Sequence, residues 1–169
     1  MPKFFKADLT ADELRSQFSY DPGTGEFSRL VRKNNKWPVG SAAGGVSKKY
    51  GYVVININGS IYKAHRLAWL YMTGEWPVAE VDHIDGNRAN NRWCNLRSAT
   101  CHQNSRNRKP VTGSYSGLKG VSLQDGRWRS TIYLDGKNRH LGYFDNAIDA
   151  HQAYVEAAKK HYGEFARWS

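Results

Sequence analysis

The spacing of apolar residues along the first third of the chain predicts one short helix followed by strands. Thr10 stands three residues before Glu13, which is the spacing of a capping box and predicts a helix over residues 11–18. Farther along, Asn58-Gly59 separates two runs that are rich in β-branched residues. This pair favours a two-residue turn, so we predict a β-hairpin here.

Helical spacing returns directly after the hairpin, in the sequence HRLAWLYMTGEWP. Apolar residues recur there three and four positions apart, and a glycine and then a proline end the pattern. Trp69 and Leu70 are expected to pack in the core. His65 and Arg66 at the start of this helix are either structural residues, which we favour, or part of a site.

The pattern changes again near the end of the chain. Three short strand-like runs are divided by two Asp-Gly pairs, which are hairpin signals. A final helix follows, which Asp145 can cap and Gly163 can end. The apolar side of this helix is expected to consist of Ile148, Ala150, Ala153, Tyr154, Ala157 and Ala158. A sheet with one covering helix leaves its other face for solvent or a partner.

These elements predict an α+β chain with two domains. The sequence RKPVTGSYSG is rich in Pro, Gly and Ser, as linkers are. We predict an N-terminal domain over 1–109 with a β-rich extension at its start, a linker over 110–117 and a closing domain over 118–169. The closing domain is expected to be a small three-stranded antiparallel sheet packed on one helix.

Charge points to a polyanionic partner. The chain carries 25 Lys and Arg against 15 Asp and Glu, a formal net charge of +10, which favours nucleic acid over a membrane surface. A merely basic protein is the alternative. Residues 88–109 contain six basic residues and no acid. The residues expected to bind nucleic acid in this stretch are Arg88, Arg92, Arg97, Arg106, Arg108 and Lys109.

Targeting and cysteine signals are few. No apolar run reaches the roughly 18 residues of a spanning helix, and the start of the chain lacks the apolar stretch of a secretory signal. We expect a cytoplasmic protein, in the host cytoplasm if a phage encodes it. Two cysteines cannot form a four-cysteine zinc site, and both are expected to be small packed residues.

Candidate chemistry lies in residues 80–107, which contain six asparagines. Hydrolysis of a phosphodiester needs a base near neutral pH, which His83 offers, and oxygen ligands for a hard cation, which Asp82 offers. A helix over about 100–107 would let Asn104 present its carbonyl oxygen beside Asp82, and Asn95 could orient His83. The alternative is a loop whose Asn and Asp side chains bond their own backbone.

The sequence VDHIDGNRANNRWCNLRSATCHQNSRN resembles the motif of HNH endonucleases, most closely the phage and intron-encoded homing type. The resemblance implies a ββα-metal (His-Me finger) nuclease module with one divalent cation per site. Asp82 and Asn104 would be its metal ligands, His83 the general base and Asn95 its orienting partner. An all-oxygen ligand set favours Mg²⁺ or Mn²⁺, so no zinc is expected. The likeness covers about residues 62–107.

The sequence from Gly117 to Ala166 resembles the DNA-binding domain of the ethylene-response-factor (Apetala-like) type. That resemblance implies a three-stranded sheet in the major groove, which accommodates such a ribbon. Alternation directs Trp128, Ser130, Ile132 and Leu134 toward the helix. The residues expected to face DNA are Lys119, Arg127, Arg129, Thr131, Tyr133, Asn138 and His140. Arg139 stands where this domain type has an apolar residue, so we expect a bulge to turn it outward. A stabilising cap or protein-interaction module is the alternative.

Together these features predict an enzyme, an HNH endonuclease that hydrolyses phosphodiester bonds in double-stranded DNA with His-activated water, either as a nickase or as a double-strand cutter. We expect no membrane association, no small-molecule cofactor and a monomer in solution. Two alternatives stay open. One is a non-catalytic, sequence-specific DNA-binding protein with a degenerate nuclease module, and the other is a protein that binds or cuts RNA.

Overall fold

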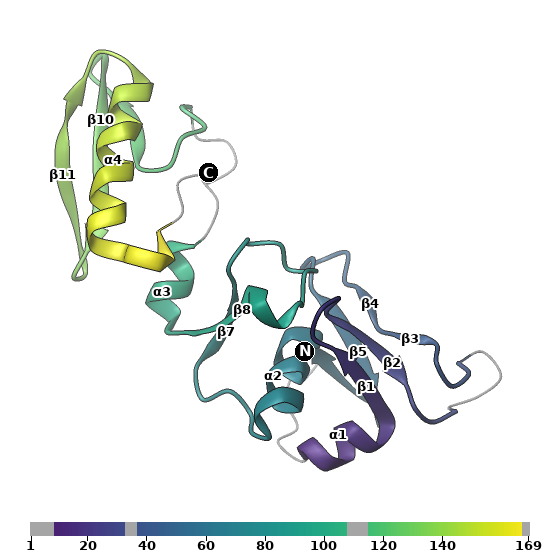
Figure 1. The fold of residues 1–169 in the computed structure, drawn as a ribbon. Helices are drawn as coiled ribbons and strands as arrows, with labels where there is room; N and C mark the ends of the chain where they lie inside the picture. The colour runs from purple at the N-terminus through teal and green to yellow at the C-terminus, as the bar shows by residue number, and fades with distance from the viewer. Residues whose placement is uncertain (1–8, 33–36, 108–114, 167–169) are drawn as a thin grey trace. The chain divides into compact units, whose positions relative to one another are not determined.

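The computed structural model describes residues 9–32, 37–107 and 115–166. Helices and short antiparallel sheets make up the chain, which confirms the predicted α+β class. The chain divides into an N-terminal unit, residues 1–100, and a C-terminal unit, residues 101–169 (Figure 1). We describe each unit by itself. The predicted division into two domains and a linker stays a prediction, and most of the linker lies outside the described residues.

Three small antiparallel sheets form the N-terminal unit. The first sheet consists of β1 (Phe18–Asp21), β2 (Glu26–Arg29) and β3 (Ala42–Ala43). The second consists of β4 (Gly45–Val46), β5 (Val53–Ile57) and β6 (Ser60–Lys63). The third pairs β7 (Glu80–His83) with β8 (Leu96–Ala99). The helices are α1 (Ala11–Gln17), α2 (Ala64–Thr73) and the 3₁₀ helix η1 (Trp93–Asn95).

Local signals set most boundaries of this unit. The capping box is confirmed, since the Thr10 hydroxyl accepts from the Glu13 amide at 3.2 Å and the Glu13 carboxylate accepts from the Thr10 amide at 2.9 Å. The Asn58-Gly59 turn between β5 and β6 is also confirmed, with φ of 49° and 82° at these two residues. Both residues adopt the positive φ that this turn type requires.

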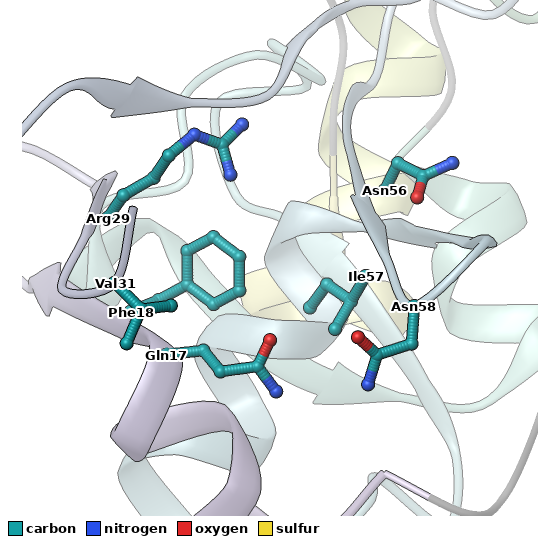
Figure 2. Close-up of a pocket in the computed structure, with 7 residues that line it drawn as sticks. All are labelled: Gln17, Phe18, Arg29, Val31, Asn56, Ile57 and Asn58. Carbon is teal, nitrogen blue, oxygen red and sulfur yellow. The ribbon is translucent and has the colours of Figure 1, made fainter. Parts of the chain in front are cut away.

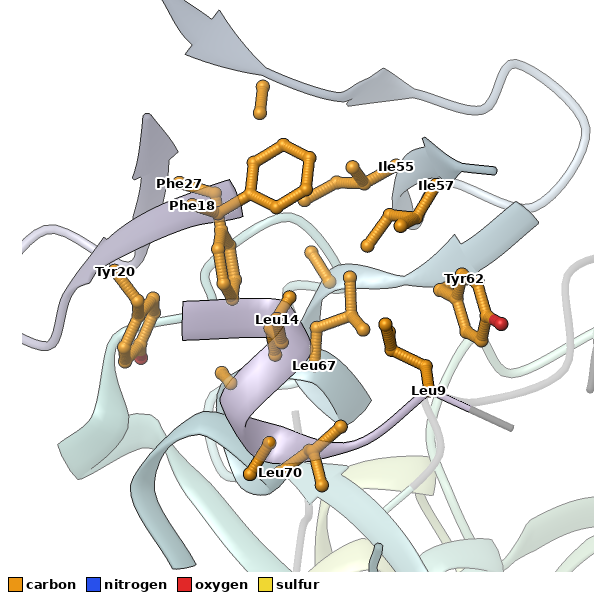
Figure 3. Close-up of a cluster of buried hydrophobic side chains, with 14 of the residues drawn as sticks. Leu9, Leu14, Phe18, Tyr20, Phe27, Ile55, Ile57, Tyr62, Leu67 and Leu70 are labelled. Carbon is orange, nitrogen blue, oxygen red and sulfur yellow. The ribbon is translucent and has the colours of Figure 1, made fainter. Parts of the chain in front are cut away.

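One apolar core holds the N-terminal unit together (Figure 3). Leu14 of α1 and Leu67 of α2 are fully enclosed, and Ile55 of β5 packs in the same cluster. Leu70 is buried as predicted, whereas Trp69 packs at the edge and is only partly buried. A fully buried leucine of this kind contributes roughly 1.5–3 kcal/mol. The core therefore anchors strands β7 and β8 in the N-terminal unit.

A three-stranded sheet and one long helix form most of the C-terminal unit, as predicted. Its elements are α3 (Cys101–Arg106), β9 (Val121–Gln124), β10 (Arg127–Leu134), β11 (Lys137–Phe144), α4 (Ala147–Tyr162) and the 3₁₀ helix η2 (Gly163–Phe165). The strand order is β11-β10-β9, and Figure 1 shows α4 lying along this sheet. Asp125 and Asp135 adopt positive φ in the two hairpin turns. Ile132 packs against Tyr154 and Ala158 in the core.

Helix α4 differs from its prediction in two respects. Asn146 caps it rather than Asp145, because the Asn146 side chain accepts from the Asp149 amide at 2.9 Å. Ile148 is 75% exposed instead of packed. Ala150, Tyr154 and Ala158 define the buried stripe, and Ile148 lies two positions before it, on the far side of a helix with 3.6 residues per turn.

Two smaller findings complete the fold. Cys94 and Cys101 are exposed free thiols, so the expectation that both are packed is wrong. Cys94 lies within η1 and Cys101 begins α3, and both are on exposed positions of these helices. Within the described ranges, no helix is both long and apolar enough to cross a membrane.

Candidate active site and nucleic-acid surface

The pairing of β7 with β8 positions the two residues expected to carry chemistry. Asp82 lies opposite Arg97, and His83 lies opposite Leu96. Asp82 is 5% exposed and His83 is 4% exposed. Arg97 donates to Asp82 Oδ2 from Nε at 3.0 Å and from Nη2 at 2.9 Å. A buried carboxylate needs such a charged partner, and here the cross-strand neighbour supplies it.

The imidazole of His83 contacts Asn91. Nε2 of His83 lies 3.1 Å from Asn91 Oδ1, and Asn91 is itself buried. The Tyr20 hydroxyl donates to the Asn91 carbonyl at 2.7 Å, which ties this loop residue to β1. Because an amide oxygen only accepts, this bond places a proton on Nε2 and leaves Nδ1 as the basic atom of the neutral ring. Asn91 was absent from our predicted site residues.

Burial lowers the pKa of His83, although the hydrogen bond that its Nε2 donates to Asn91 and the carboxylates of Asp85 and Asp82 act in the opposite direction. A histidine with a lowered pKa is neutral at pH 7 and can accept a proton. The environment of His83 is therefore that of a base rather than of a permanently charged side chain.

Asn95 braces the loop between β7 and η1 instead of contacting the His83 ring. Its amide nitrogen donates to Asp85 Oδ1 at 3.0 Å and to the Asn90 carbonyl at 2.8 Å, and its oxygen accepts from the Asp85 amide at 3.0 Å. This differs from the expectation that Asn95 orients His83 directly. The Asp85 carboxylate also accepts from Asn90 Nδ2 at 2.7 Å, so the Asx-rich alternative describes part of this segment correctly.

The hydrogen bonds of the loop outweigh burial at Asp85. Burial raises the pKa of Asp85, but bonds from Asn90, the Asn87 amide and Asn95 together lower it below its ordinary value. Asp85 therefore stays ionised and keeps the loop closed at neutral pH. The loop in turn holds Asn91 against His83.

A second histidine lies beside the first. The ring of His65, at the start of α2, is 4.8 Å from the ring of His83 and 5.1 Å from that of Tyr52. Burial, with the charges of His83 and nearby cations adding to it, lowers the pKa of His65 to about 2. Sequence reasoning favoured a structural role for His65. The structure places it in contact with the candidate base.

Asn104, the second predicted metal ligand, lies on α3 in the C-terminal unit. The pairing of Asn104 with Asp82 in one metal site stays a prediction. Across the described ranges, no three His, Cys, Asp or Glu side chains gather as a metal site. The expected ligand pair contains only one such side chain, the Asp82 carboxylate, together with the Asn104 amide.

The basic residues of the HNH-like segment that are predicted to bind nucleic acid differ from one another in exposure and in contacts. Arg88 and Arg92 are exposed, whereas Arg97 binds Asp82. The guanidinium of Arg106 lies 4.5 Å from the centre of the Tyr162 ring, and Lys119 donates to the Arg106 carbonyl. Arg108 and Lys109 lie outside the described residues.

The outer face of the C-terminal sheet carries most of the remaining predicted residues. The cross-strand pairs Arg129–Tyr143, Thr131–His140 and Tyr133–Asn138 lie on the face away from α4. Ser130 and Ile132 of β10 are buried on the helix side, as alternation predicted. Arg127 lies at the end of this face, 3.6 Å from the Asp145 carboxylate.

The expected bulge is present in β11, but Arg139 does not occupy it. The register shifts between Ser130 and Thr131, which pair with Gly142 and His140 and leave Leu141 between them. Arg139 pairs with Ile132 and is exposed. The shift moves His140 to the outer face while Leu141 packs on the core.

A pocket of about 120 Å³ lies elsewhere in the N-terminal unit (Figure 2). It is lined by Gln17, Phe18, Arg29, Val31, Asn56, Ile57 and Asn58. None of the predicted site residues lines it. The chemistry of the candidate active site therefore lies on the β7–β8 hairpin rather than in this pocket.

Comparisons with known proteins agree with the location of the candidate site. The sequence pattern described as HNH endonuclease matches residues 62–106. Protein 3.8 of Escherichia phage T7 is 34% identical over 113 residues, which cover 63% of this chain and 93% of that protein. An uncharacterized HNH endonuclease of Acanthamoeba polyphaga mimivirus is 32% identical over 146 residues, which cover 85% of this chain and 76% of that protein. No solved structure was found to match.

Proposed function

The chain belongs to the HNH endonuclease family, and we propose that it cuts double-stranded DNA by metal-dependent hydrolysis. The observation that carries the proposal is His83, a buried imidazole with a lowered pKa, adjacent to the carboxylate of Asp82 on β7. The non-catalytic alternative would need no such base.

His83 acts as the general base in this proposal. Nδ1 takes a proton from the attacking water, while Asn91 holds Nε2–H and so keeps the ring in one orientation. General-base catalysis of this kind typically contributes 10²–10⁴-fold to the rate. Asn95 supports the same geometry indirectly, through the loop that it closes.

Asp82 and Asn104 would hold a divalent cation in the ββα-metal module that we propose. Both side chains offer oxygen, so the donor set fits Mg²⁺ or Mn²⁺ better than zinc. When bound, such a cation neutralises charge on the scissile phosphate and the leaving oxygen. Arg97 donates to Asp82 Oδ2, so the cation and this guanidinium would share one carboxylate.

Binding to the duplex would be shared between the units. The outer sheet face of the C-terminal unit presents Arg129, Thr131 and His140 together, which supports the proposed ethylene-response-factor-type role in the major groove. We propose that the protein acts as a monomer with one cut per bound chain. A phage relative supports a role in the cytoplasm of a host cell.

A plasmid-nicking experiment tests the proposal. Wild-type protein with Mg²⁺ should convert supercoiled plasmid to nicked or linear DNA, and EDTA should stop the reaction. His83→Ala should lower the cleavage rate by about 10²-fold or more, with DNA affinity unchanged. His161→Ala, at an exposed position of α4, is the matched control and should cut at the wild-type rate. Cleavage by His83→Ala at the wild-type rate would contradict the base assignment.

A further inference from the structure

Two cations converge on the ring of Tyr52. Lys63 Nζ lies 4.4 Å and Arg88 Cζ lies 4.9 Å from the centre of that ring. Tyr52 precedes β5 and Lys63 ends its paired strand β6, whereas Arg88 comes from the loop after β7. Arg88 Nη1 also donates to the Tyr50 carbonyl at 3.0 Å, which holds the guanidinium in place.

Neither cation has a carboxylate within ion-pair distance among the described residues. The pKa of Lys63 is lowered, first by burial and then by the positive charges of Arg66 and Arg88, with Glu80 acting in the opposite direction. Lys63 is partly buried and Arg88 is exposed, and two like charges held beside one ring are both stabilised by an anion between them. The cluster is therefore arranged for a negatively charged ligand.

The position of this cluster indicates which anion. The Tyr52 ring lies 6.1 Å from the His83 ring, and the His65 ring contacts both. Successive nucleotides of one strand rise about 3.4 Å along the helix axis. A backbone phosphate held at Tyr52 would thus lie one or two nucleotides from a phosphate at His83.

We propose that Tyr52, Lys63 and Arg88 form a binding site for a DNA backbone phosphate next to the bond that is cut. The inference rests on the proposed function and adds a substrate contact to it. Arg88 supplies a planar fork that matches phosphate geometry, Lys63 supplies a compact charge, and the Tyr52 ring holds both in one place.

Binding measurements on the full chain test this site. Duplex DNA is titrated in EDTA, so that nothing is cut, at several salt concentrations with wild type, Lys63→Gln and Arg88→Gln. Each variant should reduce the magnitude of the slope of log affinity against log salt by about 1. Arg15→Gln is the matched control, because Arg15 also stacks on a tyrosine ring, 5.6 Å from the centre of Tyr71, and donates to its carbonyl. Its slope should equal that of wild type.

A second measurement locates the phosphate. Duplexes with a single neutral methylphosphonate, placed in turn at each position near the cut, should weaken wild-type binding at one position one or two nucleotides from the cut bond. The Lys63→Gln, Arg88→Gln double variant should be insensitive to that same replacement. Thermal unfolding of every variant shows that the chain is still folded.

The outcomes separate the two proposals. Wild-type slopes in both single variants would overturn the phosphate site even if wild type cuts DNA. Reduced slopes in a protein that never cuts DNA would leave the phosphate site standing and reject the nuclease. A wild-type chain that does not bind duplex DNA would overturn both.

Discussion

The ion pair between Arg97 and Asp82 should carry a large share of the stability of the N-terminal unit. Its nitrogen and oxygen lie 2.9 Å apart, and the two side chains are only 11% and 6% exposed. Arg97→Met keeps most of the length and apolar surface of the side chain and removes the charge. The substitution leaves the Asp82 carboxylate buried beside β8 without the guanidinium that lies opposite it.

The expected cost follows from these two hydrogen bonds and the burial. Removing one partner of a buried pair destabilises a protein by about 3–5 kcal/mol, since the remaining charge is left in a poorly hydrated place. With a urea m-value of about 1–3 kcal/mol/M for a small protein, the unfolding midpoint should fall by roughly 1–5 M.

Arg15→Met supplies the comparison. Arg15 pairs with Asp12 at 3.6 Å, with the two side chains 41% and 97% exposed. An exposed pair contributes about 1 kcal/mol or less, so this variant should unfold close to the wild-type midpoint. Urea unfolding in EDTA, monitored by circular dichroism, measures the midpoints of the Arg97→Met and Arg15→Met variants. If Arg97→Met lowered the unfolding midpoint no more than Arg15→Met does, the reasoning that the buried Asp82 carboxylate depends on Arg97 would be refuted.

Three further predictions follow from the same region. Asn91→Ala should reduce cleavage by about 10–100-fold, as loss of an orienting partner does, and should shift the acidic limb of the pH–rate profile to lower pH, because the Asn91 bond raises the pKa of His83. The free energy of unfolding should fall as the pH drops below about 6.5, since unfolded His65 binds a proton there and folded His65, with a pKa of about 2, does not. Urea midpoints of wild type and His65→Phe at pH 7.5 and 4.5 measure this pH dependence. An equal fall of the midpoint in the two proteins would contradict the prediction. Gly25→Ala should lower the thermal midpoint markedly, because Gly25 has φ of 80° and an added Cβ would lie 2.4 Å from the Arg92 amide nitrogen.

Turns and caps were predictable from the sequence wherever one local pattern decides the conformation. The Asn-Gly and Asp-Gly hairpins and the Thr10 capping box need only a few neighbouring residues, and the structure confirms each of them. The sequence could not choose between Asp145 and Asn146 as the cap of α4, because both side chains can cap a helix. The packing of the helix on its sheet selects Asn146.

The candidate site was less predictable, because its contacts join segments far apart in sequence. Asn91 and Asn95 offer the same chemistry within one loop. Tyr20 selects between them by binding the Asn91 backbone from 71 residues away. The contact of Lys63 and Arg88 through Tyr52 leaves no periodicity or motif in the sequence, and only the folded sheets bring these residues together.

The basic residues of the HNH-like segment are therefore not equivalent, although they read as one positive run. Arg97 is already neutralised by Asp82, so it adds little to the long-range attraction of DNA while that pair is intact. Arg88 keeps its charge beside Lys63, close to His83. Among the described residues, Arg97 thus has a carboxylate within ion-pair distance, whereas Lys63 and Arg88 do not. Attraction of the DNA backbone and burial of the Asp82 carboxylate then depend on different arginines, so a substitution at Arg97 should change stability more than the salt dependence of binding.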